Sequence, residues 1–144
     1  MYIKRDIEKT KKVFFRISSN CLNRSKTKYP NPETLEVGAL SGAIFETFVV
    51  NEVIKNLTNN GVNPQMCLYY YRDKDQKEID LIYVEGDVLF PIKIKKGISP
   101  NAPDKHFEVM KKYSNNVSTG IILCMTKKLQ PINKNCWLVP IEYI

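Results

Sequence analysis

Four charged residues in the middle of the chain have the types and spacing of a metal-dependent phosphodiester-cleaving site. The strand-like run PIKIKK contains Lys93 and Lys95, which alternation places on one side of a strand. The preceding strand-like run, KEIDLIYV, contains Asp80, and a helical pattern further upstream contains Glu46. Carboxylates hold Mg²⁺, and the bound ion polarises a phosphate and activates water. An acid on one strand with a basic tip on the next is the outline of such a site.

The helix that would position Glu46 is amphipathic. On a helical wheel of about 100° per residue, Glu46 falls near the middle of the apolar arc. The apolar residues of that arc are Val49, Val50, Val53, Ile54 and Leu57. A carboxylate on a core-facing stripe is rare unless it is paired or binds a metal. A structural ion pair and a functional group therefore both remain open for Glu46.

Strand periodicity predicts which side chains share a face around Asp80 and the lysines. In the second strand, one face would carry Ile79, Leu81 and Tyr83, and the other Glu78, Asp80, Ile82 and Val84. In the third strand, Phe90, Ile92 and Ile94 would lie opposite Pro91, Lys93 and Lys95. We therefore expect Asp80 to meet both lysines on one face, with Glu46 arriving from a helix laid across it.

The wider pattern predicts an α/β fold with a mixed sheet flanked by helices. The expected order is a helix at 41–58, a meander of strands at 67–73, 78–84 and 88–96, a helix at 104–113, and strands at 119–125 and 135–144. Gly61 suits a left-handed helix end. The run 119–125 is apolar with little alternation, as expected for a central strand. Pro140 predicts that the last strand lies at an edge of the sheet.

Length and composition point to one cytoplasmic domain. The chain has 144 residues and no run of 18 apolar residues, so no membrane span is expected. The charged N-terminal stretch lacks the apolar core of a secretory signal. Four scattered cysteines without a C-x-x-C pair favour free thiols in a reducing compartment.

The positive charge is concentrated in the first 30 residues. They hold nine basic residues against Asp6 and Glu8, a net of +7, which equals the net charge of the whole chain. The nine are Lys4, Arg5, Lys9, Lys11, Lys12, Arg16, Arg24, Lys26 and Lys28. Such an arm can bind nucleic-acid phosphates by releasing counterions, or it can simply be solvated.

The stretches GAIFETFVVNEVIK and YYYRDKDQKEIDLI resemble a known family. It is the uncharacterised C-terminal domain of bacterial and archaeal AAA-type ATPases, within the PD-(D/E)XK nuclease-like superfamily. The resemblance covers 32–144 and implies a restriction-endonuclease-like core there, with 1–31 as a basic arm or a partial extra element. It implies that Glu46 is the helix glutamate, Asp80 the metal-binding aspartate, and Lys95 the lysine of the Glu-X-Lys tip. Arg72 and Glu78 match polar positions beside the site.

The chain departs from that family pattern in two places. Where the pattern reads like PIEIKK, this sequence reads PIKIKK, so Lys93 stands where the second metal-binding carboxylate belongs. At about 4 Å and an effective dielectric near 20, one charge–charge interaction is on the order of 4 kcal/mol, so Lys93 would repel a dication. We therefore expect no metal and no hydrolysis; Asp80 and Glu46 would hold Mg²⁺ or Mn²⁺ only in an active site. The second departure is that no Walker motif is present, so no ATP binding is expected.

Three functions fit these patterns. The first is a pseudo-nuclease that has lost catalysis and binds DNA, RNA or a nucleic-acid-processing protein. The second is a protein-binding module that docks on a partner, dimerises, or acts as an inhibitor from a phage or mobile element. The third is an active nuclease whose second carboxylate has migrated, with Glu78 or Glu46 supplying it.

Overall fold

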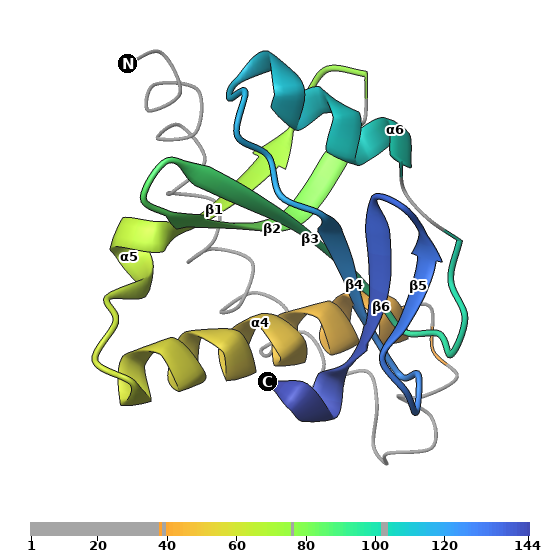
Figure 1. The fold of residues 1–144 in the computed structure, drawn as a ribbon. Coiled ribbons are helices and arrows are strands. Elements are labelled where there is room, and N and C mark those ends of the chain that lie inside the picture. The colour runs from red at the N-terminus through yellow and green to blue at the C-terminus, as the bar shows by residue number, and fades with distance from the viewer. Residues whose placement is uncertain (1–37, 39, 76, 102–103) are drawn as a thin grey trace.

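The computed structural model describes residues 38, 40–75, 77–101 and 104–144, which build one sheet and its flanking helices (Figure 1). The helices are α4 (Ser41–Asn59), α5 (Pro64–Cys67) and α6 (Asp104–Phe107). The strands are β1 (Leu68–Arg72), β2 (Glu78–Glu85), β3 (Val88–Lys95), β4 (Gly120–Cys124), β5 (Gln130–Asn133) and β6 (Cys136–Pro140). Two 3₁₀ helices, Glu108–Lys112 and Ile141–Tyr143, complete the described elements. The mixed α/β architecture expected from the sequence is confirmed.

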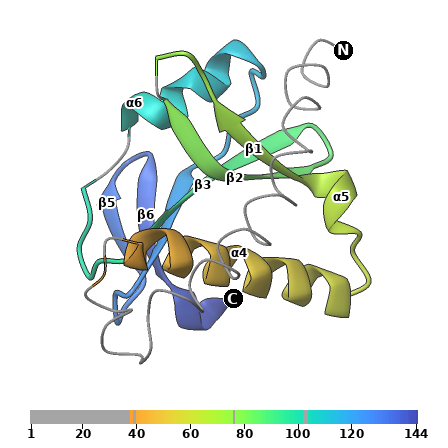
Figure 2. The ribbon, with the colours of Figure 1, turned by 180° about the vertical axis from the view of Figure 1, so that it is seen from behind.

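The sheet has six strands in the order β1-β2-β3-β4-β6-β5. β1, β2 and β3 form an antiparallel meander, whereas β4 runs parallel to both β3 and β6. β4 is therefore central, as its unbroken apolar run predicts. Helix α4 crosses one face of the sheet, and α6 with its 3₁₀ continuation covers the other (Figure 2).

Each face has its own apolar core. The α4-side core contains Val49, Val50, Leu81, Ile92, Ile94 and Leu123. The α6-side core contains Ile79, Ile82, Leu89, Phe107, Val109, Met110, Ile122, Cys124, Cys136 and Leu138. Burial of these side chains is the main favourable term that holds the helices on the sheet.

Helix α4 ends close to where the sequence predicts. Gly61 adopts a positive φ of 76°, and the N–H of Val62 donates to the Leu57 carbonyl at 2.9 Å. A left-handed glycine with this backward hydrogen bond is a common helix stop. Beyond this stop, Pro64 begins the short helix α5, because proline fits the first turn of a helix. Strand β1 consequently starts one residue later than expected.

A β-bulge in β2 changes which residues share a face. Tyr69 is paired with Ile82 and Tyr71 with Ile79. Between these two pairs the chain advances by three residues in β2 but by only two in β1. The extra residue lies at Asp80 or Leu81. As a result Ile79 and Ile82 lie in the same core, and Leu81 lies in the other. The expected grouping of Ile79 with Leu81 and of Asp80 with Ile82 is therefore wrong, because a bulge breaks strand alternation.

The C-terminal region also differs from the expectation. β6 is not at the edge, because the short strand β5 pairs along its outer side from Asn133↔Cys136 to Gln130↔Leu138. Pro140 lies beyond the last of these pairs and opposite Cys124 of β4. Its missing N–H therefore breaks no bond to β5, which explains how proline is tolerated in an inner strand. The polar sequence of β5, QPIN, carries little strand signal.

The second helix is shorter than expected. Only 104–107 are α-helical, and Glu108–Lys112 continue as a 3₁₀ helix. Phe107, Val109 and Met110 are nonetheless buried against the sheet. These three side chains belong to the α6-side core and hold the segment on that face.

Candidate functional site

At the centre of the candidate site, the carboxylate of Asp80 forms a buried ion pair with Lys93. Lys93 Nζ donates to Asp80 Oδ1 at 2.6 Å, and the backbone N–H of Ile94 donates to Asp80 Oδ2 at 2.6 Å. The side chains of Lys93 and Asp80 expose only 7% and 3% of their surface. Both carboxylate oxygens therefore already have partners inside the protein.

The end of the β2–β3 ladder creates this arrangement. The last paired residues at this end are Leu81 and Ile92. Beyond them the Asp80 carboxylate, rather than a backbone carbonyl of β2, accepts the N–H of Ile94. Asp80 thus lies where β2 and β3 stop pairing. Its carboxylate accepts the buried N–H of Ile94, which has no partner in the β2–β3 ladder.

The Lys93 side chain leaves β3 on the face of the sheet opposite α4. It is in register with Ile122 of the α6-side core, while its neighbours Ile92 and Ile94 belong to the α4-side core. The expectation that the helix of Glu46 covers the lysine face is therefore wrong. The Asp80 carboxylate lies between β2 and β3, so it still contacts the Lys93 ammonium, although the lysine side chain leaves β3 on the face opposite α4.

Two glutamates lie beside Asp80. Ligand oxygens of Glu46, Glu78 and Asp80 all lie within 4.8 Å of one another. Burial raises the pKa of Glu46 from its usual 4.5 to about 7; the negative charges of Asp80 and Glu78 add to the rise, and Lys93 and Lys95 oppose it. Glu46 is therefore a half-buried carboxyl that binds a proton near neutral pH.

The outer part of the site is formed by strand β1. Arg72 is the cross-strand partner of Glu78, with Arg72 Nε 3.9 Å from Glu78 Oε2. Tyr70 lies two residues earlier on the same face, close enough for the charge of the Arg72 guanidinium to act on its hydroxyl. Burial, then the nearby Glu78, raises the pKa of the Tyr70 hydroxyl. Arg72 is 53% exposed, so it forms the solvent-facing rim.

His106 fixes the start of β2 from the other side of the sheet. Its Nδ1 lies 3.1 Å from the backbone N of Glu78 and 3.0 Å from the Glu78 carbonyl oxygen. One tautomer accepts from the N–H and the other donates to the carbonyl. Sequence reasoning does not find this contact, because no local pattern connects His106 with a strand 28 residues earlier.

The remaining predicted site residues lie further out. Lys95 is exposed at the end of β3, close enough for its charge to lower the pKa of Glu46. The nine basic residues of the first 30 lie outside the described residues. Sequence reasoning did not identify Tyr70 as a neighbour of Arg72, although both lie in the run LYYYR.

The donor set is only partly suited to a divalent metal. Glu46, Glu78 and Asp80 offer the hard oxygens that Mg²⁺ and Mn²⁺ prefer. Asp80, however, already holds the Lys93 ammonium, and among the described residues no buried side-chain nitrogen or oxygen lacks a hydrogen-bond partner. The site as arranged therefore does not fit a dication, because Lys93 occupies the Asp80 oxygen that would bind it.

Fold and site together define a mixed α/β domain with a buried aspartate–lysine pair bordered by two glutamates. Residues 41–144 match the family described as a domain of unknown function (DUF4143). Because the match spans well over half of the chain, the protein belongs to this family. No curated protein and no solved structure matched the chain. No helix among the described residues is long and apolar enough to cross a membrane.

Proposed function

We propose that this protein is a catalytically silent, nuclease-like domain that binds nucleic acid or a protein that processes it. The observation that carries the proposal is the 2.6 Å contact between Lys93 Nζ and Asp80 Oδ1 inside the protein. An ammonium in this position supplies the positive charge that a metal ion would supply, but it cannot activate water as a Lewis acid.

Electrostatics favours the ammonium over a metal at Asp80. A dication placed beside Asp80 would lie within a few ångströms of Lys93, where one unit-charge repulsion is on the order of 4 kcal/mol at 4 Å and a dielectric near 20. The dication carries two charges, so the repulsion is about twice as large. Displacing Lys93 instead would leave a buried ammonium without its partner, which is also costly.

The nuclease-like ancestry is supported by the elements that carry the charges. A glutamate from α4, an aspartate from β2 and Lys95 from β3 occupy three of the positions that the PD-(D/E)XK resemblance assigns to a hydrolytic site. Lys93 takes the place of the second carboxylate. The same resemblance makes AAA-type ATPases the natural setting of related domains.

Nucleic-acid binding is supported by charge. The first 30 residues hold the whole net excess of +7, and Arg72 and Lys95 add exposed cations on either side of β2. Phosphate contacts of this kind dominate non-specific affinity and weaken steeply with salt.

The test combines metal titration with cleavage and binding assays. The full chain would be titrated calorimetrically with Mg²⁺ and Mn²⁺, then incubated with labelled DNA and RNA. We expect no metal binding at Asp80 and no cleavage, together with salt-sensitive binding of the same oligonucleotides. Cleavage that disappears in Asp80→Asn would refute the catalytic silence, and absence of any binding at low salt would refute the nucleic-acid role.

A second candidate, an active metal-dependent nuclease, is favoured by one observation. Glu46, Glu78 and Asp80 already lie within 4.8 Å of one another, so Glu78 could replace the carboxylate that Lys93 displaced. A Mn²⁺-soaked crystal structure separates the candidates, because only the active form would show an ion beside Asp80.

Lys93→Glu tests the assignment of the site directly. The substitution changes the local charge by two units and restores the pattern PIEIKK. We expect measurable Mn²⁺ binding by Lys93→Glu and none by the wild type. Lys127→Glu, an equal charge change at an exposed position, serves as the control and should bind no more Mn²⁺ than the wild type. An unchanged titration of Lys93→Glu would argue against this assignment.

A further inference from the structure

Charges in the site are layered from the inside to the surface. Asp80 and Lys93 form the inner layer and neutralise each other at 2.6 Å. Glu46 lies half-buried beside them. The outer layer contains Arg72 on β1 and Lys95 on β3, both exposed. Arg72, at 53% exposed, is therefore more accessible to a solute than the neighbouring Glu78, whose side chain is 29% exposed.

Tyr70 and Arg72 share the α4 face of the edge strand β1. Leu68, two residues before Tyr70, packs on the α4-side core, whereas Tyr69 and Tyr71 pack on the α6-side core. Alternation therefore puts Tyr70 and Arg72 on the face that carries Glu46. The two side chains lie close enough for the charge of the Arg72 guanidinium to act on the Tyr70 hydroxyl.

Arginine geometry allows this pair to receive an anion. The guanidinium has five N–H donors in a planar fork, so it can keep its contacts with Tyr70 and Glu78 and still donate to a phosphate oxygen. The 3.9 Å contact with Glu78 is at the long limit of an ion pair and is partly exposed, so water weakens it. Tyr70 is half-buried and lies two residues before Arg72 on the same strand, so it is a fixed neighbour for the more exposed guanidinium.

We infer that Tyr70 and Arg72 form a phosphodiester-binding lip, in which Arg72 donates to backbone phosphate oxygens of DNA or RNA and Tyr70 holds its guanidinium in place. The inference rests on the proposed nucleic-acid role and adds the residues that contact the ligand. Arg72 is the binding residue, and Tyr70 is a positioning residue that acts through it.

The test measures fluorescence anisotropy of labelled oligo-dT and oligo-U with the full chain at several salt concentrations. Arg72→Gln should weaken binding about fivefold to tenfold and lower the magnitude of the salt slope by about one. Arg72→Lys should have an affinity between those of the wild type and Arg72→Gln, because lysine keeps the positive charge but lacks the planar, forked donors of the guanidinium. Tyr70→Phe should weaken binding about twofold to threefold and leave the salt slope unchanged, because it removes no charge.

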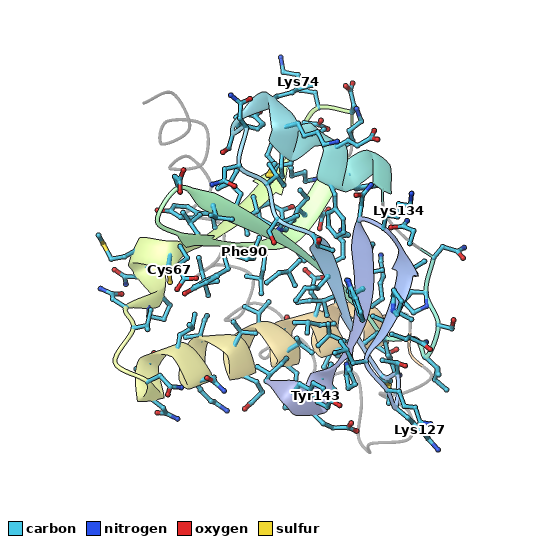
Figure 3. All side chains as sticks on the ribbon, in the orientation of Figure 1. Cys67, Lys74, Phe90, Lys127, Lys134 and Tyr143 are labelled. Atoms are coloured by element: carbon cyan, nitrogen blue, oxygen red, sulfur yellow. The ribbon has the colours of Figure 1, made fainter. Side chains whose placement is uncertain are left out.

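Lys134→Gln is the matched control. Lys134 is exposed between β5 and β6, at the opposite edge of the sheet from β1 (Figure 3). Its substitution removes the same charge and should change affinity by less than about twofold if the lip is local. Thermal unfolding of every variant checks that the fold is retained.

A second readout separates failure of the lip from failure of the proposed role. The Nε resonance of Arg72 would be followed by ¹⁵N NMR while inorganic phosphate is added to the wild type. A shift of that resonance without any oligonucleotide binding would show that Arg72 receives a phosphate but would overturn both the nucleic-acid role and the lip as a DNA or RNA contact. Oligonucleotide binding that Arg72→Gln leaves unchanged overturns the lip and leaves the role standing. An unshifted resonance together with no binding overturns both.

Discussion

Lys93 is the residue that separates this site from a metal site. Its ammonium is paired at 2.6 Å, as is that of Lys55 with Glu52 on α4, but the environments differ greatly. The Lys55 side chain is 64% exposed and that of Lys93 only 7%. Exposed pairs contribute little, whereas a buried charge that loses its partner is costly. The two pairs therefore form a natural comparison within one chain.

A double-mutant cycle on Lys93 and Asp80 measures their coupling. Lys93→Met and Asp80→Asn should each destabilise the protein by about 3 kcal/mol, because each leaves the other charge buried and unpaired. The double substitution should cost at least about 2 kcal/mol less than the sum, because both charges are gone. Urea unfolding provides the free energies. Lys55→Met should cost less than about 1 kcal/mol, and additive effects at the buried pair would contradict the structure.

Glu46 should make stability depend on pH. Its pKa is raised in the folded state from 4.5 to about 7, so the folded protein binds this proton more tightly than the unfolded chain does. The favourable contribution is complete below about pH 4.5 and is lost as the pH rises towards 7. Allowing for solvent screening, the loss is on the order of 1–2 kcal/mol.

Glu46→Gln isolates that contribution. The wild type should lose about 1–2 kcal/mol relative to Glu46→Gln between about pH 4.5 and pH 7, measured by urea unfolding across the range. Glu142→Gln, which removes an exposed carboxylate near the C-terminus, should follow the wild-type profile. Parallel curves for the wild type and Glu46→Gln would show that Glu46 titrates normally.

At the scale of elements, the β2–β3 hairpin brings Asp80 and Lys93 together. Its turn has two residues, Gly86 and Asp87, between the paired Glu85 and Val88. Gly86 has a φ of 60°, a conformation that strains residues with a Cβ. The turn fixes the register of the hairpin, and the bulge in β2 then shifts alternation on the side of Asp80.

Gly86→Ala should therefore destabilise the protein by about 1 kcal/mol, mainly through backbone strain. No neighbouring atom lies within 4 Å of the added Cβ, so steric contact does not contribute. Gly97→Ala is the matched control: its Cβ also meets open space, and its φ is outside the positive range. Thermal unfolding measures both, and equal midpoints would contradict the turn geometry.

At the scale of the whole molecule, the net positive charge is concentrated in one part of the chain. The first 30 residues carry the net excess of +7, and the rest of the chain is neutral overall. Lys127, Lys128 and Lys134 are exposed in the loops that flank β5, and Lys127 and Lys134 are labelled in Figure 3. Three lysines of the first 30 residues and these three can therefore be replaced in separate variants that have the same net charge, and the oligonucleotide affinities of the two variants can be compared.

Replacing Lys9, Lys11 and Lys12 by glutamine should reduce oligonucleotide affinity and lower the magnitude of the salt slope by up to about three. The same change at Lys127, Lys128 and Lys134 should have a much smaller effect. Anisotropy titrations at three or more salt concentrations provide both slopes. Equal losses for the two triple variants would mean that binding follows net charge alone.

The sequence by itself determined the periodic parts of this protein. The apolar periodicity of α4, the alternation in β2 and β3 and the apolar run of β4 each reflect burial along one element, and these elements are where they were predicted. The residues of the site could be selected for a similar reason: Glu46 and Asp80 are carboxylates in segments that are otherwise apolar. Short polar β5 has no such pattern, and it was missed.

Only the tertiary structure decided how those elements meet. Three features depend on how β2 pairs with its neighbours and on where β2 and β3 stop pairing. They are the bulge between Ile79 and Ile82, the hydrogen bond from the Ile94 N–H to the Asp80 carboxylate, and the approach of Lys93 from the far face. Alternation describes a single strand, whereas the end of a ladder depends on two strands and on the helices packed against them. That is why the charges were predicted to converge on one face and instead meet between two strands.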